Sequence, residues 1–240
     1  MSVEPSIVEV DRLDCRLVPH RWAFAEAEAA TLDRNWAARV ERNPTLFDGP
    51  VLLACRAEIG MEAGQRVLSL DAFETRFSRF LGWRDLGWPD RSVFNCFAMP
   101  AVRASDGSFL VGEMGPAHSA AGQRYFPGGT PDPSDVIAGG IVDLPGSLAR
   151  ELGEEAGLPA GEGAAAREWT VIFDGQRVAC IKVIDWPDTA AALRARVRDF
   201  LAREAEPELC DVHMLQPGAH DDARLPAFMA AFLARAAERG

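Results

Sequence analysis

Apolar positions in the first third of the chain follow two periods, one typical of a helix and one typical of strands. Four apolar residues within 22–42 lie three or four positions apart, which predicts a helix that buries Ala29, Leu32, Trp36 and Val40. Asn43-Pro44 is a stop signal for this helix. Residues 51–55 form a continuous apolar run, which predicts a buried strand extending to Ile59.

A second helix is predicted after Asp71, whose side chain is suited to cap a helix N-terminus. Its buried face would contain Phe73, Phe77, Phe80 and Leu81. Residues 82–89 are rich in glycine and tryptophan and are typical of a loop between two parts of a protein. We therefore expect an N-terminal α+β extension over residues 1–90 and a main domain over residues 91–240.

The main domain alternates predicted strands with predicted helices. Residues 92–103 and 109–113 read as two strands joined by a turn, and the polar residues 117–123 read as a mobile loop. Later segments predict a hairpin around Asp174-Gly175, a helix, a strand and a final helix, with the ranges 168–173, 177–185, 188–203, 209–215 and 225–239. This order indicates an α/β fold in which helices cover both faces of a mixed sheet.

Another helix of the main domain carries a cluster of acids. Glu151, Glu154 and Glu155 share one face at positions i, i+3 and i+4, while Leu148, Leu152 and Ala156 form a neighbouring apolar face. Like charges at this spacing destabilise an isolated helix by about 0.2–0.5 kcal/mol per pair, and a bound cation reverses that effect. Carboxylate oxygens suit Mg²⁺ or Mn²⁺ rather than zinc or copper.

Clustered glutamates also occur on ordinary solvated helices, because glutamate is a good helix former. The surrounding residues make this segment more specific. Arg150 precedes the first glutamate, and Gly157 with Pro159 marks the end of the helix. A glycine turn, Pro127-Gly128-Gly129, lies upstream.

Together these residues resemble the Nudix box, whose pattern is G-x5-E-x7-R-E-U-x-E-E-x-G-U, where U is a bulky aliphatic residue. Its second half is matched throughout, by Arg150, Glu151, Leu152, Glu154, Glu155, Gly157 and Leu158. The first half departs from the pattern. Gly129 lies 21 residues before Arg150 rather than 14, which implies a seven-residue insertion, and Val142 stands where the pattern has its first Glu.

The resemblance implies a Nudix-like α/β/α sandwich and Mg²⁺-dependent hydrolysis of a diphosphate. Glu151 and Glu155 would hold the metal, with Mn²⁺ as a substitute, and Glu154 would be a third ligand or orient water. Arg150 would position the glutamates. The backbone of Gly128 and Gly129 would approach the phosphates.

A later acid would serve as a further ligand or general base, and Glu208 is our preferred candidate beside Glu206 and Glu113. The histidines carry little weight: His118, in the polar loop near the box, is a minor candidate for contacting phosphate, and His213 is typical of a satisfied core or sheet residue. Phe47, Trp83, Trp88 and Phe94 are candidates for stacking on a base, although core packing is the simpler interpretation.

The substrate is suggested by looser features. The rebuilt box and the segments at residues 36–39, 43–50 and 80–83 resemble the UDP-sugar pyrophosphatase branch, which implies conversion of a UDP-sugar to UMP and a sugar 1-phosphate. Alternatives are hydrolysis of an ADP-linked or other dinucleotide substrate, and a nucleotide-sugar binding protein without turnover. A third alternative is a scaffold in which the glutamates have no role. The extension would recognise substrate or form a homodimer.

Composition restricts the partners. The net charge is −11 with one lysine among 25 basic residues, and the run Arg194, Arg196, Arg198 reads as the outer face of a helix, so nucleic acid is not expected. No apolar run approaches the 18 residues of a membrane span, so we expect no membrane association. The five cysteines are scattered without a C-x-x-C pair, which favours a reducing cytoplasm.

Overall fold

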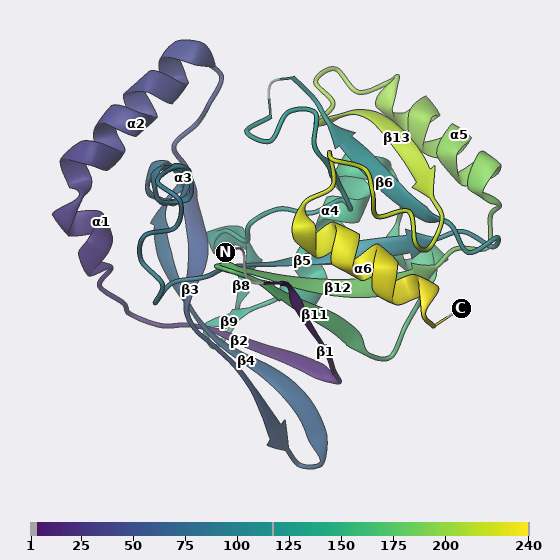
Figure 1. Cartoon of the computed structure of the whole chain (residues 1–240), viewed down its shortest axis with the longest axis horizontal. Coiled ribbons are helices and arrows are strands. Elements are labelled where there is room, and N and C mark those ends of the chain that lie inside the picture. The colour runs from purple at the N-terminus through teal and green to yellow at the C-terminus, as the bar shows by residue number, and fades with distance from the viewer. Residues whose placement is uncertain (1–3, 117, 240) are drawn as a thin grey trace. The chain divides into compact units, whose positions relative to one another are not determined.

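The computed structural model describes residues 4–116 and 118–239, which form two compact units, each with its own sheet. Unit 1 contains the described residues of 1–11, 97–129 and 145–240, and unit 2 contains residues 12–96 and 130–144. Both units are therefore discontinuous in sequence. Helices combined with sheets confirm the predicted α/β class (Figure 1).

The sheet of unit 1 has the order β1-β11-β12-β5-β6-β13, with β10 beside β12 and β7 beside β6. Its strands are β1 (Ser6–Val10), β5 (Asn95–Arg103), β6 (Phe109–Met114), β7 (Arg124–Tyr125), β10 (Ala164–Ala165), β11 (Trp169–Asp174), β12 (Arg177–Asp185) and β13 (Leu209–Leu215). The β11–β12 hairpin and β13 confirm the sequence prediction, and the continuous burial of four residues in each strand of the hairpin places it inside the core. The antiparallel pairing of β1 with β11 was not predicted.

Helices cover both faces of this sheet. The helices of unit 1 are α4 (Leu144–Ala156), α5 (Ala190–Leu201) and α6 (Ala227–Ala237), with a 3-10 turn at Ala160–Glu162. On one face Phe228 and Phe232 of α6 pack against Phe109 and Val111 of β6 in a single core cluster. The intervening β6 residues point to the other face, where α5 contacts β6 and β13.

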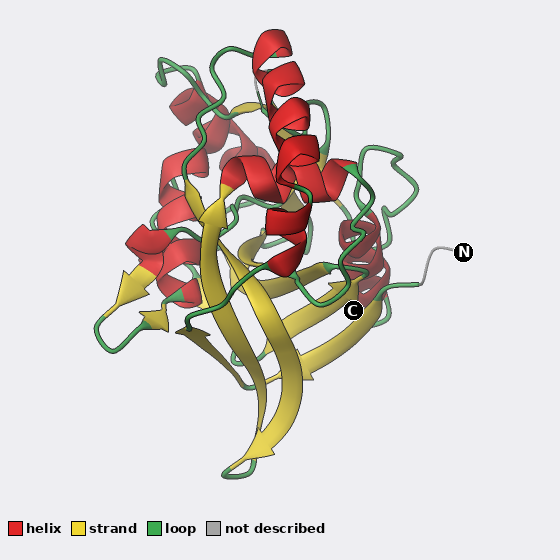
Figure 2. Ribbon diagram, turned by 90° about the vertical axis from the view of Figure 1, so that its left-hand side faces the viewer, coloured by secondary structure: helices red, strands yellow, loops and turns green. Residues whose placement is uncertain are grey.

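The sheet of unit 2 is mixed, with the order β3-β4-β2-β9-β8 and a parallel pairing between β2 and β4. Its strands are β2 (Arg12–Leu17), β3 (Pro50–Glu62), β4 (Gln65–Arg76), β8 (Val136–Ile137) and β9 (Ile141–Val142). Its helices are α1 (Ala23–Ala27), α2 (Ala29–Arg42) and α3 (Phe77–Asp85), with a 3-10 turn at Pro133–Asp135. The β3–β4 pair is visible as a long twisted ribbon in both ribbon views (Figure 2).

The predicted start of the helix after Asp71 is wrong. β4 continues to Arg76, and α3 begins only at Phe77. Asp71 caps no helix because both of its carboxylate oxygens accept hydrogen bonds from Arg56 on the neighbouring strand. Phe73 is buried as predicted, but its burial comes from cross-strand pairing opposite Leu53. A tertiary pairing has here overridden a local helix signal.

The division into units differs from the division expected at residue 90, partly because of residues 130–144. Residues 130–144 belong to unit 2, where the short β8–β9 hairpin adds to the sheet through the pairing of Ile141 with Arg16. Residues up to Asp11 belong to unit 1, through the pairing of β1 with β11. Neither contact has a local sequence signal, since the paired strands are more than 100 residues apart.

Two further observations concern compartment and membrane. No helix in the described part of the chain is long and apolar enough to cross a bilayer. All five cysteines lie in described segments, and none of them forms a disulfide. The cytoplasmic location stays a prediction.

Candidate functional site

Helix α4 presents two of the three clustered glutamates to the protein and one to solvent. Leu148, Leu152 and Ala156 are buried, which fixes the rotation of the helix about its axis. The Glu155 residue is only 5% exposed. The side chain of Glu151 is 14% exposed, whereas that of Glu154 is 61% exposed. The predicted shared face is therefore divided into a buried pair and an exposed neighbour.

The end of α4 matches its sequence signals. Gly157 follows the last helical residue with a φ of +64°, and its amide donates to the carbonyl of Gly153 at 3.0 Å. A Cβ atom at Gly157 would lie 2.5 Å from the Phe200 ring. Glycine is required at this position by the backbone conformation and by close packing.

Arg150 links two of the glutamates. Its Nη1 atom lies 2.9 Å from Glu151 Oε1 and 3.0 Å from Glu154 Oε2. The guanidinium thus compensates part of the like-charge repulsion along the helix. This is the contact that the predicted positioning role requires.

The glycine turn lies directly against the glutamates. The amide of Gly128 donates to Glu155 Oε1 at 3.0 Å. A Cβ atom on Gly129 would lie 3.4 Å from Glu151 Oε1. The expected approach of this backbone to phosphate stays a prediction, because in this structure the Gly128 amide is hydrogen bonded to a glutamate.

Glu208 is brought to the same cluster from the start of β13. Its backbone carbonyl accepts a hydrogen bond from the Gly115 amide at 2.8 Å, and its Oε1 lies 3.3 Å from His118 Nε2. Its charge acts on Glu155, as described below. Glu206 is exposed. Of the later acids that the sequence offered, Glu208 is the one that interacts with Glu155.

Burial and mutual repulsion raise the pKa of the carboxyl groups. The pKa of Glu155 is raised mainly by burial, and further by the charges of Glu208 and Glu151. Burial also raises the pKa of Glu151 and of Glu208, and the charge of Glu154 adds to the effect on Glu208. The site therefore favours either a bound proton or a bound cation.

One carboxylate oxygen tests whether a cation fits. Glu155 Oε2 is buried and has no hydrogen-bond donor, a condition that costs free energy unless a proton or a cation occupies it. No group of three His, Cys, Asp or Glu residues within 4–116 and 118–239 is arranged to hold a metal ion as it stands. The donor chemistry fits a hard divalent cation, although it is not a preformed cage.

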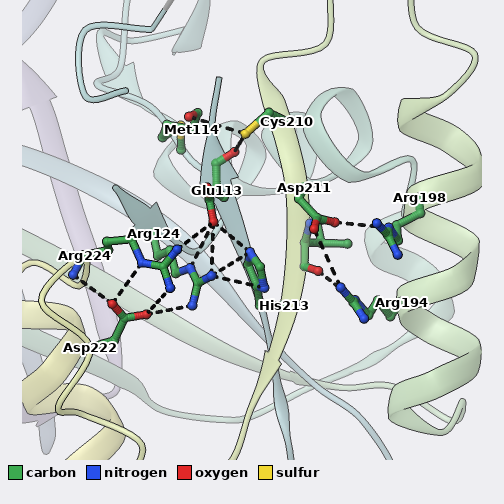
Figure 3. A network of polar contacts seen from close by, with 11 residues as sticks. Glu113, Met114, Arg124, Arg194, Arg198, Cys210, Asp211, His213, Asp222 and Arg224 are labelled. Atoms are coloured by element: carbon green, nitrogen blue, oxygen red, sulfur yellow. Dashed lines mark hydrogen bonds and ion pairs between the residues drawn. The ribbon is translucent and has the colours of Figure 1, made fainter. Parts of the chain in front are cut away.

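Glu113 and His213 belong to a separate polar network (Figure 3). Glu113 Oε2 lies 2.9 Å from His213 Nε2, 3.1 Å from Arg124 Nη2 and 3.3 Å from Arg224 Nη1. Desolvation raises the pKa of Glu113, but hydrogen bonds from Arg124 and His213 outweigh it and hold the pKa below its ordinary value. Glu113 is therefore committed to ion pairs, and the interpretation of His213 as a satisfied sheet residue is confirmed.

The remaining candidates are placed by their packing. Arg194 and Arg198 pair with Asp211, as Figure 3 shows, and Arg196 pairs with Glu162. Trp83 is fully buried in the aromatic core of unit 2, so the prediction that it stacks on a base is wrong. Phe47 is 79% exposed and keeps that possibility.

Comparisons with known proteins give limited information. No family model and no curated protein matches the chain. Among solved structures, it is similar to a MutT protein from Methanosarcina mazei Go1, with 18% identity and a TM-score of 0.41 over 61% of this chain and 94% of the other. The Nudix hydrolase RenU from M. smegmatis gives 17% identity and a TM-score of 0.39, covering 60% of this chain and 83% of the other.

A third solved structure is similar at the same level. The E. coli ORF135 protein is 22% identical with a TM-score of 0.35, covering 61% of this chain and 94% of the other. Likeness of this degree assigns no activity to the chain. The functional argument therefore rests on the residues of α4 and their surroundings.

Proposed function

We propose that the chain is a divalent-cation-dependent hydrolase that cleaves the diphosphate bond of a nucleoside diphosphate linked to another group. The supporting observation is the buried carboxylate of Glu155, with one oxygen bonded to the Gly128 amide and the other without a donor. Glu151 lies one helical turn away. The resemblance of residues 150–158 to the second half of the Nudix box favours a cation over a proton at this position.

The resemblance and the positions of the residues together suggest their roles. Glu151 and Glu155 would hold Mg²⁺ or Mn²⁺, which would supply charge neutralisation at the diphosphate. Glu154 is exposed and reaches solvent, so it serves as a third ligand or orients water. Arg150 keeps Glu151 and Glu154 in place.

Glu208 is the proposed general base. Half of its side-chain surface is exposed, while partial desolvation by the surrounding chain and the charge of Glu154 raise its pKa. It accepts the proton of the attacking water while the P–O bond to the leaving phosphate breaks. Gly128 and Gly129 have no side chains to obstruct the approach of a diphosphate to the carboxylates.

A UDP-sugar is the proposed substrate, with UMP and a sugar 1-phosphate as products. This choice is supported only by the looser sequence similarities in residues 36–39, 43–50 and 80–83. An ADP-linked compound or another dinucleotide is the alternative within the same reaction class. A nucleotide-sugar binding protein without turnover is the alternative favoured by the rebuilt first half of the box, where Val142 replaces a glutamate.

The experiment measures product release from a panel of nucleotide sugars and dinucleotides, with and without Mg²⁺, for the wild type and Glu155→Gln. We expect metal-dependent release of a nucleoside monophosphate that falls by at least about 100-fold in the variant, because an amide does not replace a charged ligand. Glu162→Gln is the matched control, since it removes an exposed carboxylate that pairs with Arg196.

Three results would contradict the proposal. Binding of a nucleotide sugar without turnover would favour the alternative of a nucleotide-sugar binding protein. Equal activity of wild type and Glu155→Gln would remove the metal role of this residue. If the wild type shows neither binding nor turnover and Glu155→Gln is more stable than the wild type, the remaining interpretation is a scaffold in which the glutamates have no role.

A further inference from the structure

We propose that His118 is a positioning residue that holds the Glu208 carboxylate towards the glutamates of α4. The inference rests on the proposed function, because it assigns a task to a neighbour of the proposed general base. The sequence places His118 and Glu208 90 positions apart, and only the fold brings them together.

The loop between β6 and β7 fixes the imidazole. The amide of His118 donates to the carbonyl of Gly115, and its carbonyl accepts from the amide of Ala121, both at 3.1 Å. The amide of Gly122 donates to the carbonyl of Met114 at 3.0 Å, which closes the loop. These bonds fix the backbone that carries the ring, and the Ala120 amide holds the ring itself through Nδ1.

The hydrogen bonds of the ring determine its tautomer. The Ala120 amide donates to His118 Nδ1 at 3.1 Å, so Nδ1 is an acceptor and the ring proton lies on Nε2. Nε2 lies 3.3 Å from Glu208 Oε1. The imidazole therefore presents an N–H donor to the carboxylate while its other nitrogen is occupied by the backbone.

Glu208 is held by the same loop at a second point. Its carbonyl accepts from the Gly115 amide, and a Cβ atom at Gly115 would lie 2.9 Å from that oxygen. The Gly115 amide thus holds the main chain of Glu208, and the His118 ring holds its side chain. Without the imidazole donor, the half-exposed carboxylate would turn to solvent, away from the charge of Glu154.

Two amide variants separate the two ring nitrogens. His118→Gln places an N–H donor near the position of Nε2, whereas His118→Asn offers an acceptor near Nδ1 and preserves the loop contact alone. We expect His118→Ala and His118→Asn to lower kcat about 10–100-fold with little change in KM. His118→Gln should recover most of kcat.

A second measurement does not depend on turnover. Long-range ¹H–¹⁵N NMR of the metal-free protein should show the Nε2–H tautomer of His118, with an Nε2 resonance that shifts in Glu208→Gln. Circular dichroism checks that the variants are folded.

The outcomes are distinguishable from failure of the proposed function. If the Nδ1–H tautomer is found, if Glu208→Gln leaves the resonance unchanged, or if His118→Asn recovers kcat as well as His118→Gln, the inference is overturned. If the NMR result is as expected but the wild type hydrolyses no diphosphate, the contact stands and the proposed function fails.

Discussion

Gly128 occupies the most restricted backbone position beside the candidate site. Its φ is +148°, and a Cβ atom there would lie 2.8 Å from the carbonyl oxygen of Ala98 and 3.0 Å from the Met99 side chain. Its amide is also the donor to Glu155. One residue therefore combines a conformational, a steric and a hydrogen-bonding requirement.

We predict that Gly128→Ala destabilises the protein by about 1–3 kcal/mol, because it introduces both strain and a contact with backbone. Urea unfolding measures the change. Gly153→Ala is the control within α4: nothing lies within 4 Å of its Cβ position, and alanine should stabilise the helix by up to about 1 kcal/mol. Equal stability of Gly128→Ala and the wild type would contradict the assigned packing.

The residue scale is where the sequence was most informative. The spacing of Glu151, Glu154 and Glu155 placed three carboxylates on one helix of fixed geometry, and the resemblance to the Nudix box implied that Arg150 positions them. The structure places Arg150 in contact with Glu151 and Glu154. The unequal burial of Glu154 and Glu155 was not predictable, since it depends on what packs against the helix.

At the scale of elements, a cluster of ion pairs ties β6, β7 and β13 to the loop that precedes α6. Arg124 is central, because its Nη1 lies 2.7 Å from Asp222 and its amide donates to the carbonyl of Arg224 at 2.9 Å. Its side chain is only 10% exposed. The start of α6 is thus connected to the sheet by charge as well as by apolar packing.

This cluster predicts a pH dependence of stability. Hydrogen bonds from Arg224, together with the charge of Arg124, lower the pKa of Asp222 from 3.8 to about 2. A carboxyl group with a lowered pKa in the folded state stabilises the protein above its unfolded pKa, and this contribution is lost as the pH falls towards 2. We expect Asp222→Asn to be less stable than the wild type at pH 6, with the difference shrinking between pH 4 and 2.

Urea midpoints measured from pH 2 to pH 6 test this prediction. Asp221→Asn is the control, because the neighbouring Asp221 side chain is 99% exposed and should have almost no effect. A constant difference between wild type and Asp222→Asn across the whole range would show that the charge of Asp222 is not the cause.

At the scale of the molecule, each unit is completed by a segment from outside its main stretch of sequence. β1 adds to unit 1 through its pairing with β11, and Val10 of β1 is only 1% exposed. The β8–β9 hairpin adds to unit 2 in the same manner. The division of the chain is therefore a product of strand pairing and not of one linker.

We predict that removal of the residues up to Asp11 destabilises the protein by about 3 kcal/mol, through the loss of the buried side chain of Val10 and the half-buried side chains of Ile7 and Val8. The melting temperature should fall by roughly 6–12 °C, and light scattering should increase because β11 becomes an exposed edge strand. Ser6→Ala, at the exposed start of β1, is the control. An unchanged melting temperature after truncation would contradict the structural role of β1.

The sequence by itself determined the local features of this protein: the α4 glutamates with Arg150, the stop at Gly157, the β11–β12 hairpin and β13. Each depends on neighbours within a few residues, which periodicity and turn chemistry describe.

The tertiary structure decided the rest. It turned residues 71–76 into strand, placed β1 in unit 1 and residues 130–144 in unit 2, and brought His118 to Glu208, whose charge acts on Glu155. Pairing between distant strands and burial in a shared core determine these features, and neither leaves a pattern in any single stretch of the chain.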